Sequence, residues 1–290
     1  MANERVGGMA LMLGSALSSQ VGAATAALAF PVIGPAGVVA VRQWVAGALL
    51  LAAGRPRLRS FTAREWRPVL ALALVFATMN LSLYTAIDRI GLGLAVTLEF
   101  LGPVAVALAG SRRLVDVGCA LVAAPAAMVL ARPQPTADYL GIGLALLAAI
   151  CWACYILLNR TVGSRLPGAQ GSAAAALVSA LVYVPIGLVV LWLHPPTGYS
   201  LGEALTAGVL SSAVPFLVDL LALRRVPPQF FGLFMSVNPV LAALVGLVVL
   251  GQRLAWLDWV AIGAIAGAMV VASVGSWAFG TRSRTPRSAT

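Results

Sequence analysis

YLGIGLALLAAICWACYILL, residues 139–158, is a run of 20 residues without a charged side chain. A helix of this length rises about 30 Å, which matches the hydrocarbon core of a bilayer. Similar apolar runs recur along the chain, separated by short polar breaks or breaks that contain Pro and Gly. Because backbone groups in lipid must be paired within the protein, and these runs lack the alternation of barrel strands, they predict transmembrane helices.

The composition of the whole chain supports the same interpretation. Of its 290 residues, 61% are hydrophobic and 10% are charged, and the mean hydropathy is +0.97. That is more apolar surface than one water-soluble core hides, so we expect an all-α membrane protein. The first run is too long for a signal peptide and is expected to be retained. The runs predict ten helices, over residues 7–30, 36–53, 68–87, 91–110, 114–131, 139–158, 172–194, 201–223, 229–250 and 256–279.

The basic residues indicate an orientation in the membrane. The net charge is +10 and every basic residue is arginine, but the arginines lie in short loops between helices and not on one face, which argues against a nucleic-acid partner. With a cytoplasmic N-terminus, fifteen arginines fall in inward loops and tails, and three fall outside, namely Arg89, Arg132 and Arg253. This bias predicts a multi-pass protein of the inner membrane with both termini in the cytoplasm.

A weak internal repeat divides the chain. Residues 86–108 align with residues 222–244 at a constant offset of 136, which places Pro103 on Pro239. Each half contains five predicted helices, an odd number, so the second copy runs through the bilayer in the opposite direction. We therefore expect a first five-helix repeat at residues 1–133, a second, inverted repeat at 134–280, and a basic cytoplasmic tail at 281–290.

We single out three of the ionisable residues that lie inside predicted helices, where unpaired charges are costly. Arg42 and Glu99 both lie about 9 to 12 Å from the outer ends of their helices. They are candidates for a charge pair beside a central cavity, with Glu99 binding substrate or exchanging a proton; the alternative is a permanent structural salt bridge. Asp219 is a third candidate for coupling, although its place near the cytoplasmic end also suits a solvated, snorkelling carboxylate.

Polar and aromatic residues predict the lining of a pocket. Asn80 and Tyr84 are one helical turn apart, and Trp152 and Tyr155 share a face in the same way. These four residues are candidates for substrate binding, and packing or interfacial aromatics are the alternative.

Two helix breaks occur at equivalent points of the halves. Gly102 with Pro103, and Asn238 with Pro239, are expected to interrupt their helices and expose backbone groups to a cavity, with Asn238 as a further binding residue. The alternative is a kink that serves packing.

Catalysis and metal binding have little support in the sequence. Cys119, Cys151 and Cys154 all lie in apolar segments, and the Cys-x-x-Cys pair has no second pair of ligands. The single histidine, His194, precedes two prolines at the end of a helix. We therefore expect no enzyme activity, no metal site and no cofactor.

Several segments together resemble the drug/metabolite transporter superfamily, in its EamA-type branch, and within it the threonine/homoserine exporters of the RhtA kind. They are ATMNLSLYTAI (77–87), LEFLGPVAVAL (98–108) followed by SRRLVD, ICWACYILLNR (150–160), LSSAVPFLVDLLALRRVP (210–227) and SVNPVLAAL (236–244). The resemblance implies a ten-helix inverted repeat and proton-driven efflux of amino acids, and it matches Arg42, Asn80, Glu99 and Asp219 to polar residues of such exporters. Two positions depart from the pattern, because Asn238 and Gln252 stand where those exporters tend to carry glutamate.

The sequence therefore predicts a secondary transporter that exports small amino acids or related metabolites by alternating access, with protons as coupling ions and the lipid bilayer as surroundings. Export of aromatic amino acids, purines or xenobiotics is the alternative within the same class, and a non-transporting membrane scaffold is the alternative from another class. Whether two copies form a homodimer is left open by the sequence.

Overall fold

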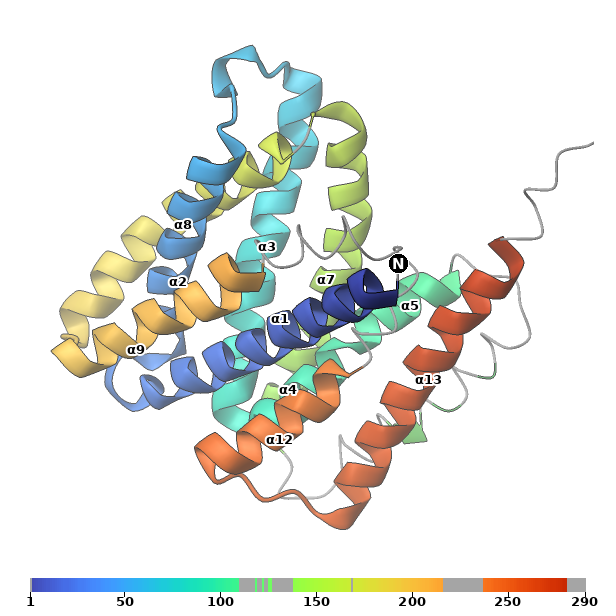
Figure 1. Ribbon diagram of the computed structural model, residues 1–290. Coiled ribbons are helices and arrows are strands. Elements are labelled where there is room, and N and C mark those ends of the chain that lie inside the picture. Colours follow the sequence, from blue (N-terminus) through green and yellow to red (C-terminus); the bar gives the residue numbers. More distant parts are fainter. Residues whose placement is uncertain are drawn as a thin grey trace, which may run out of the picture.

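The described residues of the computed structural model form helices joined by short turns (Figure 1). The structure describes residues 2–109, 118, 122, 125–126, 138–167, 169–215 and 237–280. The α-helices are α1 (Ala2–Leu28), α2 (Phe30–Gly54), α3 (Ala63–Ile90), α4 (Leu92–Glu99), α5 (Leu101–Ala109), α7 (Tyr139–Arg165), α8 (Gln170–Leu193), α9 (Gly198–Gly208), α12 (Asn238–Leu250) and α13 (Trp256–Gly280). A short 3-10 helix η1 (Leu58–Ser60) precedes α3, and a π-helix η2 (Val209–Ala213) follows α9.

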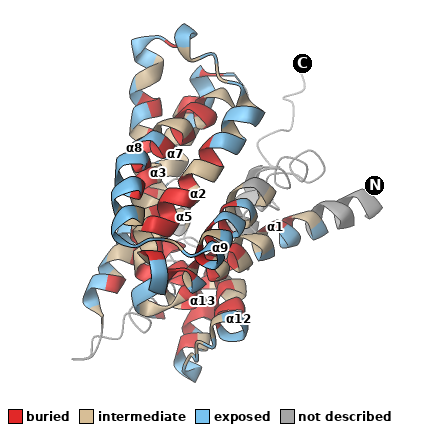
Figure 2. Ribbon diagram, turned by 90° about the vertical axis from the view of Figure 1, so that its left-hand side faces the viewer, coloured by how far each residue is buried: buried red, intermediate tan, exposed pale blue. Residues whose placement is uncertain are grey.

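Within the described part of the chain, five helices are long and apolar enough to cross a membrane, namely α1, α2, α3, α7 and α8. Their outward faces carry large apolar side chains, such as Leu74 with 67% and Leu188 with 61% of its surface exposed. In Figure 2 the buried residues lie between α2, α3 and α7, and exposed residues cover the outer side of α8. An apolar exterior around a packed interior is what lipid requires, so the helices form a membrane-embedded bundle.

Local signals in the sequence explain where several helices begin. Thr62 and Glu65 form a capping box at the start of α3, in which the Glu65 carboxylate accepts from the Thr62 backbone N–H at 2.7 Å. Asp138 caps α7 by accepting from the backbone N–H of Gly141 at 2.8 Å. Both caps satisfy amides that a helix start leaves without a partner inside the helix.

The first two helices are joined almost without a loop, because only Ala29 separates α1 from α2. Inside α2 the chain turns at Gly34, whose φ of 65° is open to glycine without strain, and Pro35 follows it. The predicted helix of residues 36–53 therefore corresponds to the part of α2 after this turn.

The predicted helix of residues 91–110 is interrupted, as the Gly102 and Pro103 pair suggested, but the interruption lies at Phe100, between α4 and α5. Pro103 has no N–H to donate to the carbonyl of Glu99 four residues earlier, which weakens the helix at this point. Gly102 lies just after the break, and a Cβ atom there would collide with the carbonyl oxygen of Ala149 on α7. The glycine therefore allows α5 to pack closely on α7.

Other predictions fall partly or wholly outside the described residues. These include most of the predicted helix 114–131, the second part of 201–223, the first part of 229–250, and Asp219. Within the described part, α9 and η2 occupy the beginning of 201–223, and α12 begins at Asn238, with Pro239 in its first turn.

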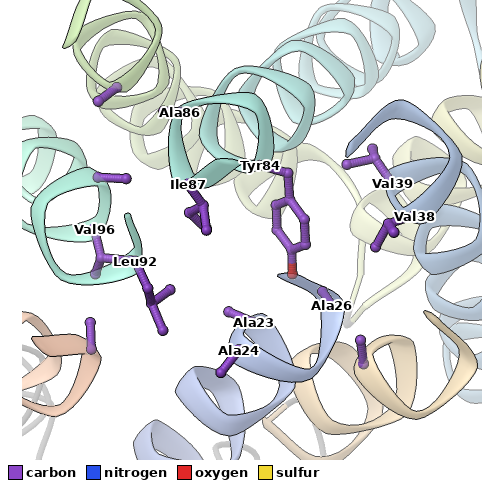
Figure 3. Close-up of a cluster of buried hydrophobic side chains, with 14 of the residues drawn as sticks. Ala23, Ala24, Ala26, Val38, Val39, Tyr84, Ala86, Ile87, Leu92 and Val96 are labelled. Atoms are coloured by element: carbon purple, nitrogen blue, oxygen red, sulfur yellow. The ribbon is translucent and has the colours of Figure 1, made fainter. Parts of the chain in front are cut away.

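Helices α2 and α8 pack closely against each other. A Cβ atom at Gly47 would lie 2.7 Å from the Cβ of Ala180, and the buried side chain of Gln43 donates from Nε2 to Ser179 Oγ at 2.9 Å. Helix α1 packs on α9 and α12, α7 packs on α3 and α5, and α13 lies at the edge of the bundle beside α12 (Figure 1). The buried core runs through these contacts, and Figure 3 shows Tyr84 within it, pointing from α3 toward Ala23 and Ala26 of α1.

Candidate functional site

A cavity of about 200 Å³ lies inside the bundle, lined by residues of α1, α2, α3, α4, α7, η2 and α12. Helices from the first and second parts of the chain therefore both contribute to it. Six of the residues singled out from the sequence line this cavity: Arg42, Asn80, Tyr84, Glu99, Trp152 and Asn238.

Arg42 is held in the cavity by neutral partners. Its Nη1 donates a short hydrogen bond to Asn80 Oδ1, and its Nη2 donates to the backbone carbonyl of Ser211 at 3.4 Å. The guanidinium carbon lies 4.8 Å from the ring centroid of Tyr84, over its face, in a cation–π contact. Asn80 is itself oriented by donating to the carbonyl of Phe76 at 2.8 Å. These contacts fix the direction of the positive charge without neutralising it.

Glu99 is the acidic residue among the described residues of the cavity wall, and it is the last residue of α4. Only 5% of its surface is exposed. Within the described part of the chain, no ion pair joins it to Arg42 and no hydrogen bond reaches its carboxylate. Arg42 and Glu99 thus share the cavity without the direct salt bridge that the sequence left open.

Aromatic side chains form part of the wall. Phe100 and Trp152 pack edge to face with ring centroids 4.5 Å apart, where α4 meets α7. The hydroxyl of Tyr84 is buried and has no hydrogen-bond partner in the described structure. A buried hydroxyl of this kind is costly to leave unpaired, so it is a group that a bound solute would satisfy.

Four residues from the sequence-based list lie elsewhere. Tyr155 is not in the cavity wall but packs beside Phe76, with ring centroids 6.1 Å apart. Gly102, Pro103 and Pro239 are also absent from the wall. Each lies close in sequence to a wall residue, namely Phe100 for the first two and Asn238 for Pro239.

The sequence reasoning missed several polar residues of the wall. Gln20 of α1 donates from Nε2 to Asn238 Oδ1 at 3.0 Å and is buried. Ser211 of η2 donates from Oγ to the carbonyl of Ser19 at 3.2 Å. The run Ser18–Ser19–Gln20 inside an apolar helix was the available signal. The π-helix at Ser211 had none, although such segments are frequent at functional sites.

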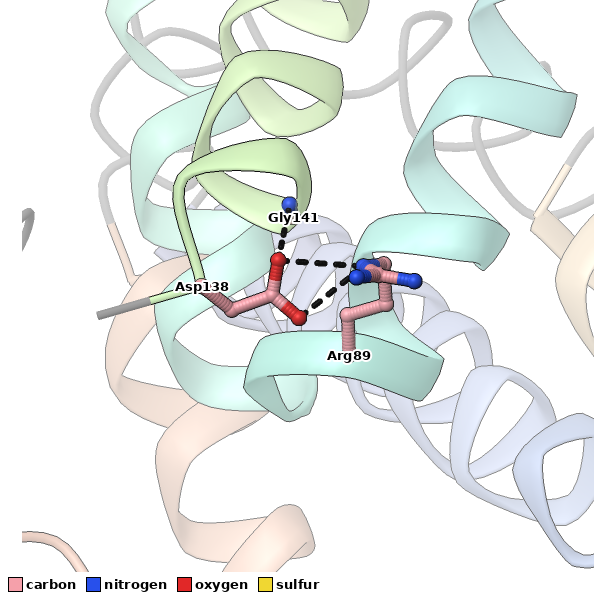
Figure 4. A network of polar contacts seen from close by, with 3 residues as sticks. All are labelled: Arg89, Asp138 and Gly141. Atoms are coloured by element: carbon pink, nitrogen blue, oxygen red, sulfur yellow. Dashed lines mark hydrogen bonds and ion pairs between the residues drawn. The ribbon is translucent and has the colours of Figure 1, made fainter. Parts of the chain in front are cut away.

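Different contacts join the helices at the two ends of the bundle. At one end Arg89 of α3 pairs with Asp138 at the start of α7, with Nε and Oδ2 2.9 Å apart (Figure 4), and Gln252 Oε1 accepts from the backbone N–H of Leu92 at 2.9 Å. At the other end Arg165 donates to the carbonyl of Arg64 at 2.8 Å. Hydrogen bonds from Gly141 and Arg89 lower the pKa of the Asp138 carboxyl, so the pair at the first end is charged at neutral pH.

Comparison with known proteins decides the family. The sequence profile of the EamA-like transporter family matches residues 139–274. The threonine/homoserine exporter RhtA of Salmonella typhimurium strain SL1344 is 37% identical over 276 residues, which cover 92% of this chain and 90% of the relative. This chain belongs to the EamA-like transporter family. RhtA of Escherichia coli strain K12 is 36% identical over 275 residues, with the same coverage of both chains.

A solved structure supports the fold of this EamA-like transporter. A crystal structure aligns with a TM-score of 0.60 at 20% sequence identity, covering 93% of this chain and 98% of the other. Together with the long apolar helices, family membership makes the chain a multi-pass membrane transporter and not an enzyme. Among the described residues, no group of three His, Cys, Asp or Glu side chains is arranged to hold a metal ion.

Asn238 and Gln252, which the resemblance singled out, lie in different places in this EamA-like transporter. Asn238 lines the cavity and pairs with Gln20, so a neutral amide stands at the cavity wall. Gln252 lies at the end of the bundle, where its side chain caps the start of α4. Of these two residues, Asn238 is the one that belongs to the described wall of the cavity.

Proposed function

We propose that this protein exports small amino acids, of the threonine and homoserine type, across the inner membrane. The observation that carries the proposal is the cavity of about 200 Å³ whose wall contains both a cationic and an anionic side chain. Its size lies below the roughly 300–1,000 Å³ typical of pockets for drug-sized ligands, which favours a small solute over xenobiotics. The substrate named for the 37% identical relative supports the same class.

The proposal includes a ten-helix architecture with repeats at residues 1–133 and 134–280. The contact between α2 and α8 supports it, since Gln43 and the Ser179 to which it bonds are separated by the repeat offset of 136 residues. The close approaches of Gly54 to Ala173 and of Gly37 to Val190 are exchanged by the same offset. A local twofold relation between α2 and α8 accounts for all three contacts.

The remaining packing supports the same relation between repeats. At this offset α1 corresponds to α7, α3 to α9, and α5 to α12. The packing of α1 on α9 and α12 then corresponds to the packing of α7 on α3 and α5. Two such bundles that rock about a shared cavity would give alternating access.

Proton coupling and orientation complete the proposal. Glu99 is a buried carboxylate in the cavity wall and is the proposed group that exchanges a proton during transport. The backbone N–H of Arg57 donates to Gln170, and Arg165 donates to the carbonyl of Arg64. These contacts bring several arginines together at one end of the bundle. That end is the proposed cytoplasmic face, with both chain termini on the same side.

Reconstitution tests the proposed function directly. Purified protein in proteoliposomes loaded with labelled threonine or homoserine should release label faster than liposomes without protein, and an inward proton gradient should increase the rate. A panel of aromatic amino acids and purines, loaded in the same way, should leave at the background rate. Absence of protein-dependent flux for every compound would favour a scaffold, and selective flux of the aromatic or purine compounds would replace the substrate class.

A further inference from the structure

The cavity wall contains two charged side chains of opposite sign among its described residues. Arg42 comes from α2 and Glu99 from α4, and the other described residues of the wall are neutral. The two charges share the cavity without forming an ion pair. Two opposite charges in one cavity wall that form no ion pair with each other are complementary to a solute that carries both charges.

We infer that Arg42 binds the carboxylate and Glu99 binds the ammonium group of one zwitterionic α-amino acid. This inference rests on the proposed function and adds to it the orientation of the substrate and the basis of selection. Both head groups are required, because a solute that carries only one of them would leave the other charge of the wall without a partner.

Arg42 has the properties of a carboxylate receptor. Its partners are an amide oxygen, a backbone carbonyl and an aromatic face, so no described partner cancels its charge. Its Nε is buried and has no hydrogen-bond partner in the described structure. Because Asn80, Ser211 and Tyr84 already hold the guanidinium plane, little side-chain freedom is lost when a carboxylate binds.

Glu99 has the complementary properties. An ionised carboxylate is an acceptor with no donor of its own, and described residues supply it with no hydrogen bond. An ammonium group offers three donors and a positive charge, and would replace the water that burial has removed. The neighbouring Phe100 and Trp152 rings make this side of the cavity wall apolar.

The site should select against a solute that lacks one of the two head groups, because that solute leaves one charge of the wall unpaired. An amino alcohol would leave the Arg42 charge without an anion, and a hydroxy acid would leave the Glu99 charge without a cation. Sites that are built to pair a polar group reject analogues without that group far more strongly than they reject a change of size. The amide pair of Gln20 and Asn238 lines the same cavity.

Counterflow in proteoliposomes tests the inference on the wild-type protein. Vesicles are loaded with unlabelled threonine, homoserine, threoninol, or the hydroxy acid in which a hydroxyl replaces the amino group of threonine, and the entry of external labelled threonine is measured with the membrane potential clamped at zero. Threonine and homoserine should drive counterflow, and each analogue should drive it at least about tenfold less. An analogue that drives counterflow as well as threonine overturns the pole assigned to its missing group. Absence of counterflow with threonine and homoserine overturns the proposed function itself.

Variants assign each pole to its residue. Arg42→Gln should reduce the preference for threonine over threoninol, and Glu99→Gln should reduce the preference over the hydroxy acid, each by about tenfold. Arg42→Lys should keep part of the first preference, because it retains the charge and loses the planar fork. Arg59→Gln and Glu203→Gln are matched controls that should keep both preferences. Arg59 is exposed, Glu203 is half-buried, and both lie outside the cavity wall. A variant without flux is assessed by whether labelled threonine still binds in detergent, and unchanged preferences in active variants overturn the assignment.

Discussion

Gln43 and Ser179 are 136 residues apart in the chain and share one buried hydrogen bond of 2.9 Å between α2 and α8. The same offset relates Pro103 to Pro239. The bond therefore lies where a twofold axis between the proposed repeats would pass. Because both side chains are buried, neither has water as an alternative partner.

Removing one partner of this bond should destabilise the bundle. Gln43→Ala or Ser179→Ala should each lower the free energy of unfolding by about 1–3 kcal/mol, because the remaining polar group is buried without a partner. The double variant should cost less than the sum of the two single variants, since they act on one interaction. Thermal unfolding in detergent measures all four proteins, and additive losses would contradict a shared bond.

The helices were predictable from the sequence because apolar length is a strong signal in a membrane protein. The runs that became α7 and α8 were placed within a few residues at most ends, and α7 extends further, to Arg165. The turn at Gly34 falls in the gap that the sequence prediction left between its first two helices, whereas the π-helix at Ser211 was not predicted. The break near Pro103 was predicted, but its position at Phe100 depends on how α5 meets α7.

A substitution at Gly102 should test that contact. Gly102→Ala should destabilise the protein by about 1–3 kcal/mol, because the added methyl group would collide with the backbone carbonyl of Ala149 and backbone cannot rotate away. Gly143→Ala is a matched control on α7, where a Cβ atom would meet nothing within 4 Å. Melting temperatures in detergent compare the two, and equal effects would show that α5 does not pack this closely.

The pair of Asp138 and Arg89 should contribute to stability in a pH-dependent way. The pKa of Asp138 is lowered in the folded state, first by the Gly141 backbone N–H and then by Arg89. Its contribution is therefore complete above the unfolded pKa of about 3.9, and is lost as the pH falls through the lower folded pKa. Asp138→Asn keeps the helix cap and loses the charge, so its melting temperature should lie below that of the wild type at neutral pH and approach it in acid. Asp138→Ala, which also loses the cap, should stay below at every pH, and a wild-type advantage that grows in acid would contradict this assignment.

Gln252 should stabilise the start of α4 through a single acceptor atom. Gln252→Ala leaves the part-buried N–H of Leu92 without its partner, and should cost about 1–3 kcal/mol. Gln252→Glu keeps an oxygen at the same position and should retain most of the stability. Thermal unfolding compares the stability of the two variants. An equal loss of stability in both would show that the hydrogen bond to Leu92 contributes little.

The candidate site was predictable in part for a different reason. Arg42, Asn80 and Glu99 stood out because polar side chains are rare in lipid-spanning helices, and all three line one cavity. Tyr155 was assigned from helical spacing alone, which does not show which neighbour covers a helix face. In the structure, Phe76 packs beside Tyr155. Gln20 was overlooked because its partner Asn238 is 218 residues away in the chain.

Glu99→Gln should separate transport from folding. The substitution removes the charge and the exchangeable proton while it keeps nearly the same volume, so the packing beside Phe100 and Trp152 is preserved. Cells loaded with labelled threonine or homoserine should show reduced efflux through this variant, at least about tenfold below wild type, with unchanged amounts in the membrane. Glu203→Gln on α9 removes a carboxylate away from the cavity and should retain wild-type efflux.

Because no described residue neutralises the carboxylate of Glu99 directly, a loss of transport without a loss of stability is the expected signature of a group that acts on the solute. Unchanged efflux through a properly expressed Glu99→Gln protein would remove Glu99 from the transport mechanism.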